Sequence, residues 1–432
     1  MKYVFMHNFR GFSDTVLPLK QLTFLVGENS TGKSSFLKLL YLLSLPQFWF
    51  SPELAFQELA DLGGFDDMVS AWAEDRSFFQ IGALMSLKQK RTSHPSYTFT
   101  ALTFSNRDGS PEASRFLQFA DGRLTKLVFQ RKRTKYKTLD LDTSLSTDEE
   151  AIKLFRKLVQ KDRDDMEGFS LFPKEIPPGP PLPVALAILR AIAKGKPLEA
   201  TEFPGELPFT LNLTWIAPIR TKPQRFYDGM RKTFTPEGDH TPFILRKSLR
   251  TKVKSKDFAE KLRIFGKYSG LYEAITPHSF DRSPQSPFEI LVKFSGAELN
   301  INNVGYGVSQ VLPLIVEFLS RERGRTFAVQ QPEVHLHPRA QAALGDLVAE
   351  LARDKKQSFF FETHSDYLID RCRLNLADAP NGPNAQVIFF QRSEKGNIAT
   401  VLDIDENGRY PADQPSEFRD FFVKEEMRLL EV

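Results

Sequence analysis

The sequence predicts an α/β fold that carries an antiparallel β subdomain and a helical middle lobe. The first observation is a glycine-rich segment, Gly27 to Ser35, set between an apolar run and a helix with an apolar face. The second is an alternation of strands and helices that begins at Phe288. The third is a series of short runs from Ser77 to Leu139 in which apolar and polar residues alternate, as in strands with one buried face.

The segment from Gly27 to Ser35 matches the phosphate-binding pattern G-x-x-x-x-G-K-[ST]. Leu22 to Val26 is typical of the buried strand before such a loop. In this order, inward-facing backbone N–H groups and a helix start hold phosphate, Lys33 reaches the β and γ phosphates, and Ser34 ligates Mg²⁺. The residues expected to hold ATP are Gly27, Glu28, Asn29, Ser30, Thr31, Gly32, Lys33, Ser34 and Ser35. The alternative is an ordinary strand-to-helix turn that happens to carry glycine and lysine.

The segments around this loop are expected to be simple. Met1 to Val26 predicts two strands joined by a polar turn. Arg10 and Gly11 lie where an adenine or ribose contact is expected, although a solvated turn explains them equally well. Asp61 to Asp67 interrupts the helical pattern and predicts a loop.

The middle of the chain predicts the meander followed by helices and a proline-rich loop. The expected elements are helices at Thr147–Val159, Pro183–Ala193 and Phe258–Phe265, a loop at Pro173–Pro181, and strands at Leu211–Ile219 and Phe288–Phe294. We therefore expect three parts. Residues 1–86 hold the N-terminal half of the core with the phosphate loop, 87–286 the meander and helical insertion, and 287–432 the C-terminal half of the core.

Composition bounds the class of protein. The chain has 432 residues, 41% of them hydrophobic and 26% charged, which is typical of globular proteins. Cys372 is the only cysteine, so an intramolecular disulfide and a cysteine-based zinc site are excluded and a reducing compartment is favoured. No apolar run approaches the ~20 residues that span a bilayer, so we expect a cytoplasmic protein without membrane contact.

Two further strands end in polar residues that can complete a nucleotide site. Thr326–Val329 runs into Gln330, Gln331, Pro332 and Glu333, and Ser358–Phe361 runs into Glu362-Thr363-His364-Ser365-Asp366. The first strand end should hold Mg²⁺ and polarise the attacking water, and the second should sense the γ-phosphate through His364. The expected catalytic residues are Gln330, Gln331, Glu333 and His364, with Ser34 and Gln330 at the metal. A purely structural His364 is the alternative.

Together these motifs resemble the ABC-type AAA ATPases related to the OLD and SMC-like families, including ATPase subunits of bacterial anti-phage systems such as PARIS and Septu. The resemblance rests on GENSTGKSS, NNVGYGVSQVLPLI (Asn302–Ile315), QQPEVHLHP (Gln330–Pro338), ETHSDYLIDR (Glu362–Arg371), WIAPIR (Trp215–Arg220), GDHT (Gly238–Thr241) and the tail Asp403–Phe422. It implies a P-loop ABC-type ATPase core, and a head-to-tail dimer or higher oligomer. It also implies a separate effector protein, a nuclease being the expected kind.

The resemblance also assigns a second nucleotide contact. In such families a signature segment meets the γ-phosphate bound to the partner subunit, and here that segment corresponds to Gly305, Gly307, Ser309 and Gln310. A glycine pair before a helix is physically suited to anions. The alternative is an ordinary helix from Gln310 to Leu319 with Ser309 as its N-cap.

One departure from the family pattern concerns Mg²⁺. Relatives usually place an acid where Gln330 stands, and an amide oxygen is a weaker ligand for a hard cation and cannot accept a proton from water. Either an engineered Glu-to-Gln exchange or a naturally slow ATPase accounts for this. Glu333 can replace the missing Mg²⁺ carboxylate, or it can hold the loop that follows Pro332. We expect ATP binding with little turnover.

Other features allow further functions. His335 and His337 form an H-x-H pair without a third metal ligand nearby, which favours loop positioning over metal binding. Basic clusters at Arg131–Lys137 and Arg246–Lys256 are either solvated faces or phosphate contacts for nucleic acid. An alternative function is therefore a DNA-repair or DNA-clamp ATPase of the RecF or SMC kind. A transporter motor is disfavoured because no L-S-G-G-Q sequence occurs.

Overall fold

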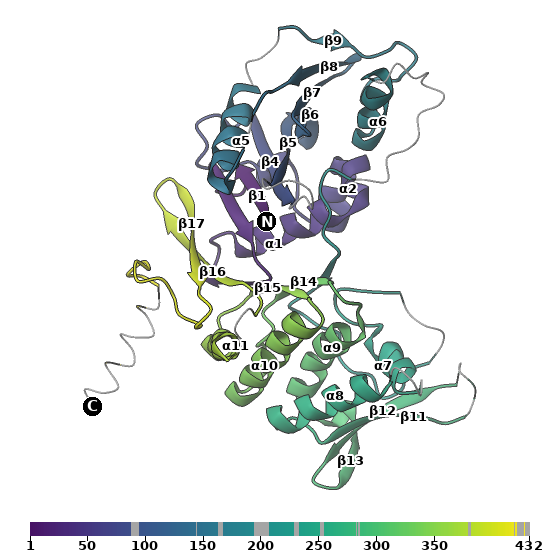
Figure 1. The fold of residues 1–432 in the computed structure, drawn as a ribbon. Coiled ribbons are helices and arrows are strands. Elements are labelled where there is room, and N and C mark those ends of the chain that lie inside the picture. The colour runs from purple at the N-terminus through teal and green to yellow at the C-terminus, as the bar shows by residue number, and fades with distance from the viewer. Residues whose placement is uncertain are drawn as a thin grey trace. The chain divides into compact units, whose positions relative to one another are not determined.

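The computed structural model describes residues 1–87, 95–143, 145–162, 167–193, 207–228, 233–250, 255–281, 283, 286–378, 382–418, 420 and 427. The chain forms two compact units (Figure 1). The first comprises residues 1–20, 28–211 and 390–400, and the second comprises residues 21–27, 212–389 and 401–432. The fold is mixed α/β, with antiparallel sheets and helices, as predicted.

The first unit is built on an antiparallel sheet with the order β2-β1-β4-β5-β6-β7-β8-β9. Its strands are β1 (Lys2–His7), β2 (Thr15–Leu19), β4 (Phe78–Leu87), β5 (Ser96–Arg107), β6 (Ser110–Ala120), β7 (Arg123–Gln130), β8 (Arg133–Asp140) and β9 (Ser170–Leu171). Asp108-Gly109 and Asp121-Gly122 turn the chain with positive φ, which tight hairpins require. The predicted meander is therefore confirmed, with longer strands than expected.

Helices cover both faces of this sheet (Figure 1). They are α1 (Lys33–Ser44), α2 (Pro46–Phe50), α3 (Pro52–Leu54), η1 (Ala55–Leu59), α4 (Phe65–Met68), α5 (Asp148–Asp162) and α6 (Leu182–Ala193). On one face Phe56 meets Phe104 edge-on at 5.1 Å, and on the other Phe155 of α5 meets Phe5 at 5.2 Å. This packing accounts for many of the phenylalanines.

The second unit contains a sheet with the order β10-β14-β15-β3-β16-β17. Its strands are β10 (Leu213–Ile216), β14 (Thr326–Gln330), β15 (Ser358–Glu362), β3 (Leu22–Gly27), β16 (Ala385–Ser393) and β17 (Gly396–Ile404). Strands β10, β14, β15 and β3 are parallel neighbours. Their carboxyl ends therefore lie at one edge of the sheet, where ligands of α/β folds bind.

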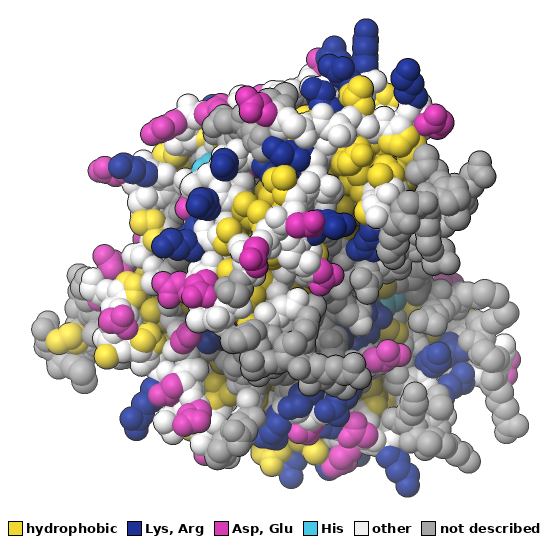
Figure 2. Space-filling model, turned by 45° about the horizontal axis from the view of Figure 1, so that its top comes forward, with side chains coloured by type: hydrophobic (Ala, Val, Ile, Leu, Met, Phe, Trp, Pro, Cys, Tyr) yellow, Lys and Arg dark blue, Asp and Glu magenta, His cyan; other side chains and the backbone are white. Residues whose placement is uncertain are grey.

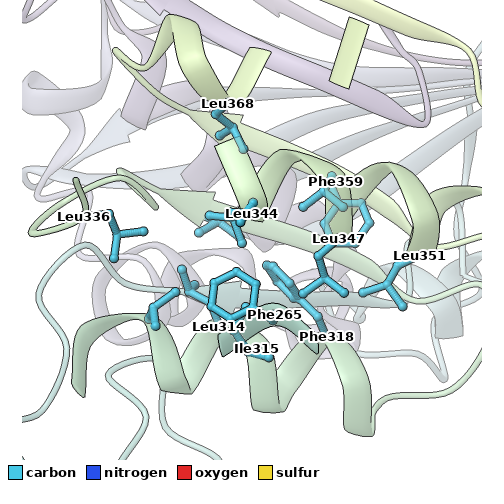
Figure 3. Packing of buried hydrophobic residues seen from close by; sticks show 14 of the residues in the cluster. Phe265, Leu314, Ile315, Phe318, Leu336, Leu344, Leu347, Leu351, Phe359 and Leu368 are labelled. Atoms are coloured by element: carbon cyan, nitrogen blue, oxygen red, sulfur yellow. The ribbon is translucent and has the colours of Figure 1, made fainter. Parts of the chain in front are cut away.

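Helices α7 (Thr241–Arg250), α8 (Ser255–Ser269), α9 (Tyr306–Ser320), α10 (Pro338–Asp354) and α11 (Asp366–Ala377) belong to the same unit, together with a short η3 (Ile301–Asn303). Figure 3 shows side chains of α8, α9 and α10 meeting over the sheet. Phe318 of α9 is fully buried, with its ring centroid 4.8 Å from Phe327 and 5.0 Å from Phe359. This core holds the strands that carry the predicted catalytic residues.

Two expectations about elements were wrong, for Met1–Val26 and Asp61–Asp67. The strand Phe288–Phe294 is confirmed, but the sheet that contains it and helix α7 were not anticipated. Met1 to Val26 forms three strands rather than two, and Asp61 to Asp67 includes the start of α4. The strand Phe288–Phe294 (β12) pairs with β11 (Ala274–Ser279) and β13 (Ala297–Asn300) in a separate antiparallel sheet. Helix α7 was not anticipated, because its basic residues concealed the apolar face formed by Phe243, Ile244 and Leu245.

Within the described residues, no helix combines the length and apolarity needed to cross a bilayer.

Candidate nucleotide site

The phosphate loop follows β3 in the chain and leads into α1. Ser30 and Gly32 have φ of 61° and 96°, the left-handed conformation that turns a backbone sharply. Gly32 is the N-cap of α1, and no side chain caps the helix start. The first N–H groups of α1 therefore suit an anion.

Gly32 is required by space as well as by conformation. A Cβ at this position would lie 2.4 Å from the ring of Phe12 and 3.1 Å from the side-chain nitrogen of Asn397. Phe12 is itself fully buried. The loop thus packs closely on segments remote from it in sequence.

Lys33 is only 3% exposed and folds back on its own loop. Its Nζ donates to the carbonyl oxygen of Glu28 at 2.6 Å, and the Thr31 hydroxyl donates to the same oxygen at 2.7 Å. Glu28, Asn29 and Ser30 are exposed. A phosphate that binds here would compete with the Glu28 carbonyl for the Lys33 ammonium.

Arg10 contacts the Asp61–Asp67 segment. Its guanidinium donates to the Leu62 carbonyl. Burial lowers the pKa of Arg10, and the nearby carboxylates of Asp67 and Asp61 oppose this shift. The structure thus places Arg10 in a half-buried polar contact.

Sequence reasoning missed two residues near the loop. Arg392 donates to the Ser30 carbonyl at 3.2 Å, and Asn397 donates to the Arg10 carbonyl at 3.2 Å and lies beside Gly32. Both come from the β16–β17 region, more than 350 residues along the chain. No local motif marks them, so only the tertiary structure identifies them.

The strand ends of the second unit bring Gln330 and Glu362 together. The parallel register pairs Gln330 with Glu362, and Glu362 with Leu25 of β3. Gln330 Nε2 donates to Glu362 Oε2 at 2.8 Å, and the Gln331 backbone N–H donates to the Glu362 carbonyl at 2.7 Å. Glu362 belongs to the recognised ETHSD segment, but the sequence did not assign it a role.

Glu333 organises the segment that carries His364. Glu333 Oε2 accepts from the Thr363 hydroxyl and Oε1 accepts from the His364 backbone N–H, both at 2.8 Å. The His364 side chain is exposed. Glu333 therefore holds the loop, and His364 projects from it.

Arg220 lies behind the Gln330–Gln331 backbone and is 3% exposed. Its Nη2 donates to both carbonyls at 3.3 Å, whereas Nε and Nη1 have no hydrogen-bond partner within the described part of the chain. Burial lowers the pKa of Arg220 to about 10, and the Glu333 carboxylate opposes the shift. A buried cation thus supports this strand end from within.

The signature-like segment starts a helix earlier than expected. Helix α9 begins at Tyr306 with Gly305 as its N-cap, so the alternative in which Ser309 is the N-cap is wrong. Ser309 lies within the first turns, where its hydroxyl donates to the Tyr306 carbonyl at 3.0 Å. Ser309 and Gln310 are buried, while Gly305 and Tyr306 are exposed.

Gly307 and the two histidines have structural contacts. A Cβ on Gly307 would lie 3.0 Å from the His335 carbonyl oxygen, and the Tyr306 ring lies against the His335 ring at 5.7 Å. His337 caps α10 through the Ala340 backbone N–H. Among the described residues no group of three metal-ligating side chains occurs.

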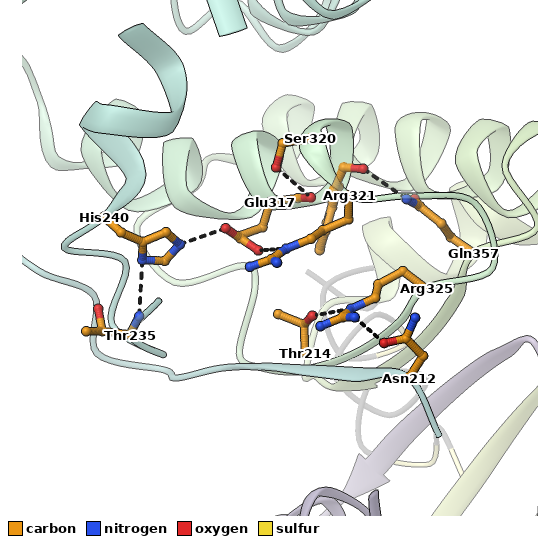
Figure 4. A network of polar contacts seen from close by, with 10 residues as sticks. Asn212, Thr214, Thr235, His240, Glu317, Ser320, Arg321, Arg325 and Gln357 are labelled. Atoms are coloured by element: carbon orange, nitrogen blue, oxygen red, sulfur yellow. Dashed lines mark hydrogen bonds and ion pairs between the residues drawn. The ribbon is translucent and has the colours of Figure 1, made fainter. Parts of the chain in front are cut away.

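The far end of α9 is anchored by a buried polar network (Figure 4). His240 Nδ1 accepts from the Thr235 backbone N–H, which leaves Nε2–H to donate to Glu317 Oε1 at 2.7 Å. Arg321 Nε donates to Glu317 Oε2 at 2.6 Å. Burial alone would raise the pKa of Glu317, but the bonds from His240 and Arg321 lower it below its usual value.

The basic clusters differ in their surroundings. Arg131, Lys132 and Arg133 are exposed at the β7–β8 hairpin, whereas Arg246 is buried with its guanidinium 4.5 Å from the centroid of the Phe288 ring. Lys252 and Lys254 lie outside the described residues. On the face in Figure 2, basic and acidic side chains are interspersed.

A family model described as an AAA ATPase domain matches residues 1–90 and 232–369, more than half of the chain. Among curated proteins, no sequence matches.

Solved structures similar to this chain include the SMC head bound to the C-winged helix domain of ScpA, with 12% identity and a TM-score of 0.44, covering 93% of this chain and 98% of that chain. The SMC head domain from Thermotoga maritima has 10% identity and a TM-score of 0.39. The match covers 93% of this chain and 98% of that chain. A third structure is an SMC head domain with an extended coiled coil, bound to the C-terminal domain of ScpA derived from Pyrococcus furiosus. It has 11% identity and a TM-score of 0.39, and the match covers 99% of this chain and 100% of that chain.

Proposed function

Because the chain belongs to the AAA ATPase domain family, we propose that it binds ATP with Mg²⁺ through the loop from Gly27 to Ser35 and hydrolyses it slowly. Copies of the chain assemble head to tail around the nucleotide as a dimer or higher oligomer. The nucleotide state then controls a separate effector protein.

The observation that carries the proposal is the backbone of the loop. Left-handed Ser30 and Gly32 precede a helix start that no side chain caps, and Lys33 folds over the loop. This combination concentrates positive potential where a triphosphate would bind. Ser34, the next residue of the motif, supplies a hydroxyl for Mg²⁺.

Slow hydrolysis follows from the residues at the end of β14. Gln330 and Gln331 are both neutral, and an amide does not act as a general base. Glu333 is engaged by Thr363 and by the backbone of His364. In the proposal, His364 senses the γ-phosphate and Glu333 keeps its loop in place.

Assembly would use the start of α9. Ser309 and Gln310 are buried, so the exposed surface offered to a second copy is the backbone near Gly305 and Gly307. Because α9 has 15 residues, its N-terminal N–H groups carry the partial positive charge of a full helix. The γ-phosphate held by one copy would bind there on the next.

Lys33→Ala tests nucleotide binding directly. We expect loss of ATP binding, measured by equilibrium dialysis with labelled ATP and Mg²⁺. Lys38→Ala, on the same helix, is the matched control and should bind as wild type does, because Lys38 contacts only the Asp61 carbonyl in the described residues. Unchanged ATP binding by Lys33→Ala would contradict the proposed nucleotide site.

Light scattering tests assembly. With ATP and Mg²⁺ at high protein concentration, the wild-type chain should exceed the mass of a monomer and Lys33→Ala should not. A monomeric wild type that nevertheless binds ATP would remove the assembly step and leave nucleotide binding standing.

The effector and the biological setting rest on resemblance alone. Similar motifs occur in ATPase subunits of anti-phage systems such as PARIS and Septu, which supports a nuclease effector and a defence role for this chain. Purification from the native host with ATP, followed by mass spectrometry, should identify a bound nuclease. Recovery of the assembled chain alone would argue against this part.

A DNA-clamp ATPase of the RecF or SMC kind is the second candidate, favoured by the exposed Arg131, Lys132 and Arg133. Phosphate contacts of this kind weaken steeply with salt. ATP-dependent binding of duplex DNA without any effector would favour this reading, and salt-independent or absent binding would exclude it.

A further inference from the structure

The first unit contains a pocket that shares no residue with the loop from Gly27 to Ser35. Its volume is about 290 Å³, near the lower end of the ~300 to 1,000 Å³ range of small-molecule sites. Its walls come from α2 and α3, from strands β5, β6 and β7, and from the proline-rich segment before α6. All of these elements belong to the first unit, so the pocket is defined within one compact body.

Hydrogen bonds hold two of these walls in place. The Phe172 N–H donates to the Thr134 carbonyl at 2.9 Å, and the Gly179 N–H donates to the Thr134 hydroxyl at 3.1 Å, which fixes the proline-rich segment against β8. Trp49 of α2 donates from its indole nitrogen to the Leu43 carbonyl at 3.0 Å. The pocket is therefore formed before any ligand enters, as small-molecule sites usually are.

Part of the lining is apolar and presents ring surfaces. Phe50, which is 41% exposed, and Phe129 supply aromatic rings. Pro178, Pro180 and Pro181 supply saturated rings. Aromatic side chains stack on planar ligands, and every nucleobase has a face that can stack in this way. This part of the lining thus suits a flat ring system.

The polar part of the lining contains a carboxylate that accepts hydrogen bonds. Glu53 is half-buried, and the Ala113 backbone N–H donates to it. Burial and the charge of Glu112 raise the pKa of Glu53, while the Ala113 bond and the charge of Arg107 oppose this shift. Arg107 is itself ion-paired with Glu112. A ligand that donates N–H groups to Glu53 would therefore stabilise its ionised form.

Basic residues lie at the pocket and next to it. Arg131 lines the pocket, and Lys132 and Arg133 follow it at the exposed hairpin between β7 and β8. Arg133 Nε donates to Gln130 Oε1 at 3.1 Å, and Gln130 also lines the pocket. Three consecutive cations repel a basic side chain of a protein partner and attract phosphate. The charges thus favour an occupant that combines N–H donors with a phosphate.

We propose that this pocket binds a nucleotide whose base carries an amino group, either free or as part of a single strand. The base would lie among the rings and donate to Glu53, and its phosphate would contact Arg131. Adenine, cytosine and guanine carry such amino groups, whereas thymine does not. A base inside a duplex cannot enter, because it is stacked and paired. The site would act independently of the proposed ATP site.

The test compares two bases on the full chain in EDTA, because the proposed binding of ATP at Gly27–Ser35 uses Mg²⁺. Titration calorimetry with dCMP and dTMP measures free nucleotides, and fluorescence anisotropy with labelled oligo-dC and oligo-dT measures single strands. The cytosine ligand should bind about 5- to 100-fold more tightly than the thymine ligand. Binding of dCMP would identify a free nucleotide as sufficient, and binding of oligo-dC alone would identify a strand.

Two variants separate the base contact from the phosphate contact. An amide both donates and accepts, so Glu53→Gln should weaken binding of cytosine ligands and bring the affinities for cytosine and thymine together. Arg131→Ala should weaken both ligands by the same factor and reduce the dependence on salt. Arg123→Ala is the matched control, because Arg123 is exposed at the opposite end of β7 and pairs with Asp140, and it should bind as wild type does.

Circular dichroism establishes that each variant is folded. The proposal is overturned if neither dCMP nor oligo-dC binds to wild type, or if folded Glu53→Gln keeps the wild-type preference for cytosine. Equal losses in Arg131→Ala and Arg123→Ala would also overturn it, since they would indicate a general effect of charge. Duplex DNA that binds as tightly as oligo-dC would exclude the base pocket. None of these results bears on ATP binding at Gly27–Ser35, which is tested separately by Lys33→Ala.

Discussion

At the scale of single residues, the site depends on which strand end carries charge. Gln330 and Glu362 share one hydrogen bond at 2.8 Å, and Arg220 supports the backbone on the inner side. Gln330 is neutral and donates its amide N–H to Glu362. The same neutrality removes a group able to accept a proton from water.

Gln330→Glu should raise ATP hydrolysis about 10- to 100-fold, because it adds a carboxylate, next to that of Glu362, at the strand end proposed to hold Mg²⁺. Phosphate release measured under saturating ATP and Mg²⁺ checks this. Without Mg²⁺ the two carboxylates repel each other, so the variant should also melt at a lower temperature in EDTA than with Mg²⁺. Equal ATPase rates for the variant and wild type would contradict the role assigned to position 330.

At the scale of elements, the two ends of α9 differ in their polar contacts. No side chain caps its first turn, where Gly305 is the N-cap. Its last turns carry the hydrogen-bonded network of His240, Glu317 and Arg321 (Figure 4). Burial lowers the pKa of the nearby Arg325, and the charge of Glu317 opposes this shift. Because Glu317 is 2% exposed, its carboxylate relies on these partners, and breaking such a buried network is costly.

Glu317→Gln should lower the free energy of unfolding by about 1 to 3 kcal/mol at pH 7. The pKa of Glu317 is lowered by folding, so its stabilisation is present above the ordinary value of 4.5 and is lost as the pH falls below it. Urea unfolding at pH 7 and near pH 4 should therefore show a smaller difference between variant and wild type at the lower pH. Glu322→Gln, an exposed residue just past the same helix, should change little at either pH. A pH-independent difference would rule out the ionic role.

At the scale of the whole molecule, the chain folds into two compact units. The chain passes from one unit to the other at the Gly27–Glu28 peptide bond, inside the phosphate loop itself. The end of β3 and the strand ends at Gln330 and Glu362 belong to the second unit, and Lys33 belongs to the first.

ATP with Mg²⁺ should raise the melting temperature of the wild-type chain, because a ligand that binds only the native state stabilises it by about 2.7 kcal/mol at 100 times its Kd. Lys33→Ala should lose this gain while melting normally without nucleotide. Differential scanning calorimetry over a range of ATP concentrations measures both. A melting temperature that does not respond to ATP in wild type would contradict nucleotide binding.

Local sequence patterns were enough to predict the strand, glycine turn and helix around Gly32, the meander, and the strands that end at Gln330 and Glu362. These features depend on near neighbours: glycine at a left-handed position, alternation along a strand, and a helix with an apolar face. The placement of β12 in its own sheet and the start of α9 at Tyr306 escaped prediction. Both depend on packing against segments far along the chain, which short patterns do not encode.

By itself, the sequence predicted a phosphate-binding loop and showed that β14 lacks the acid that the family resemblance implies. Only the tertiary structure decided that Glu362 meets Gln330, and that Asn397 and Phe12 enclose Gly32. The physical reason is that these contacts depend on the register between strands. Which side chains meet across parallel strands is set by the alignment of backbones more than 30 residues apart, and that alignment is set by the core beneath them.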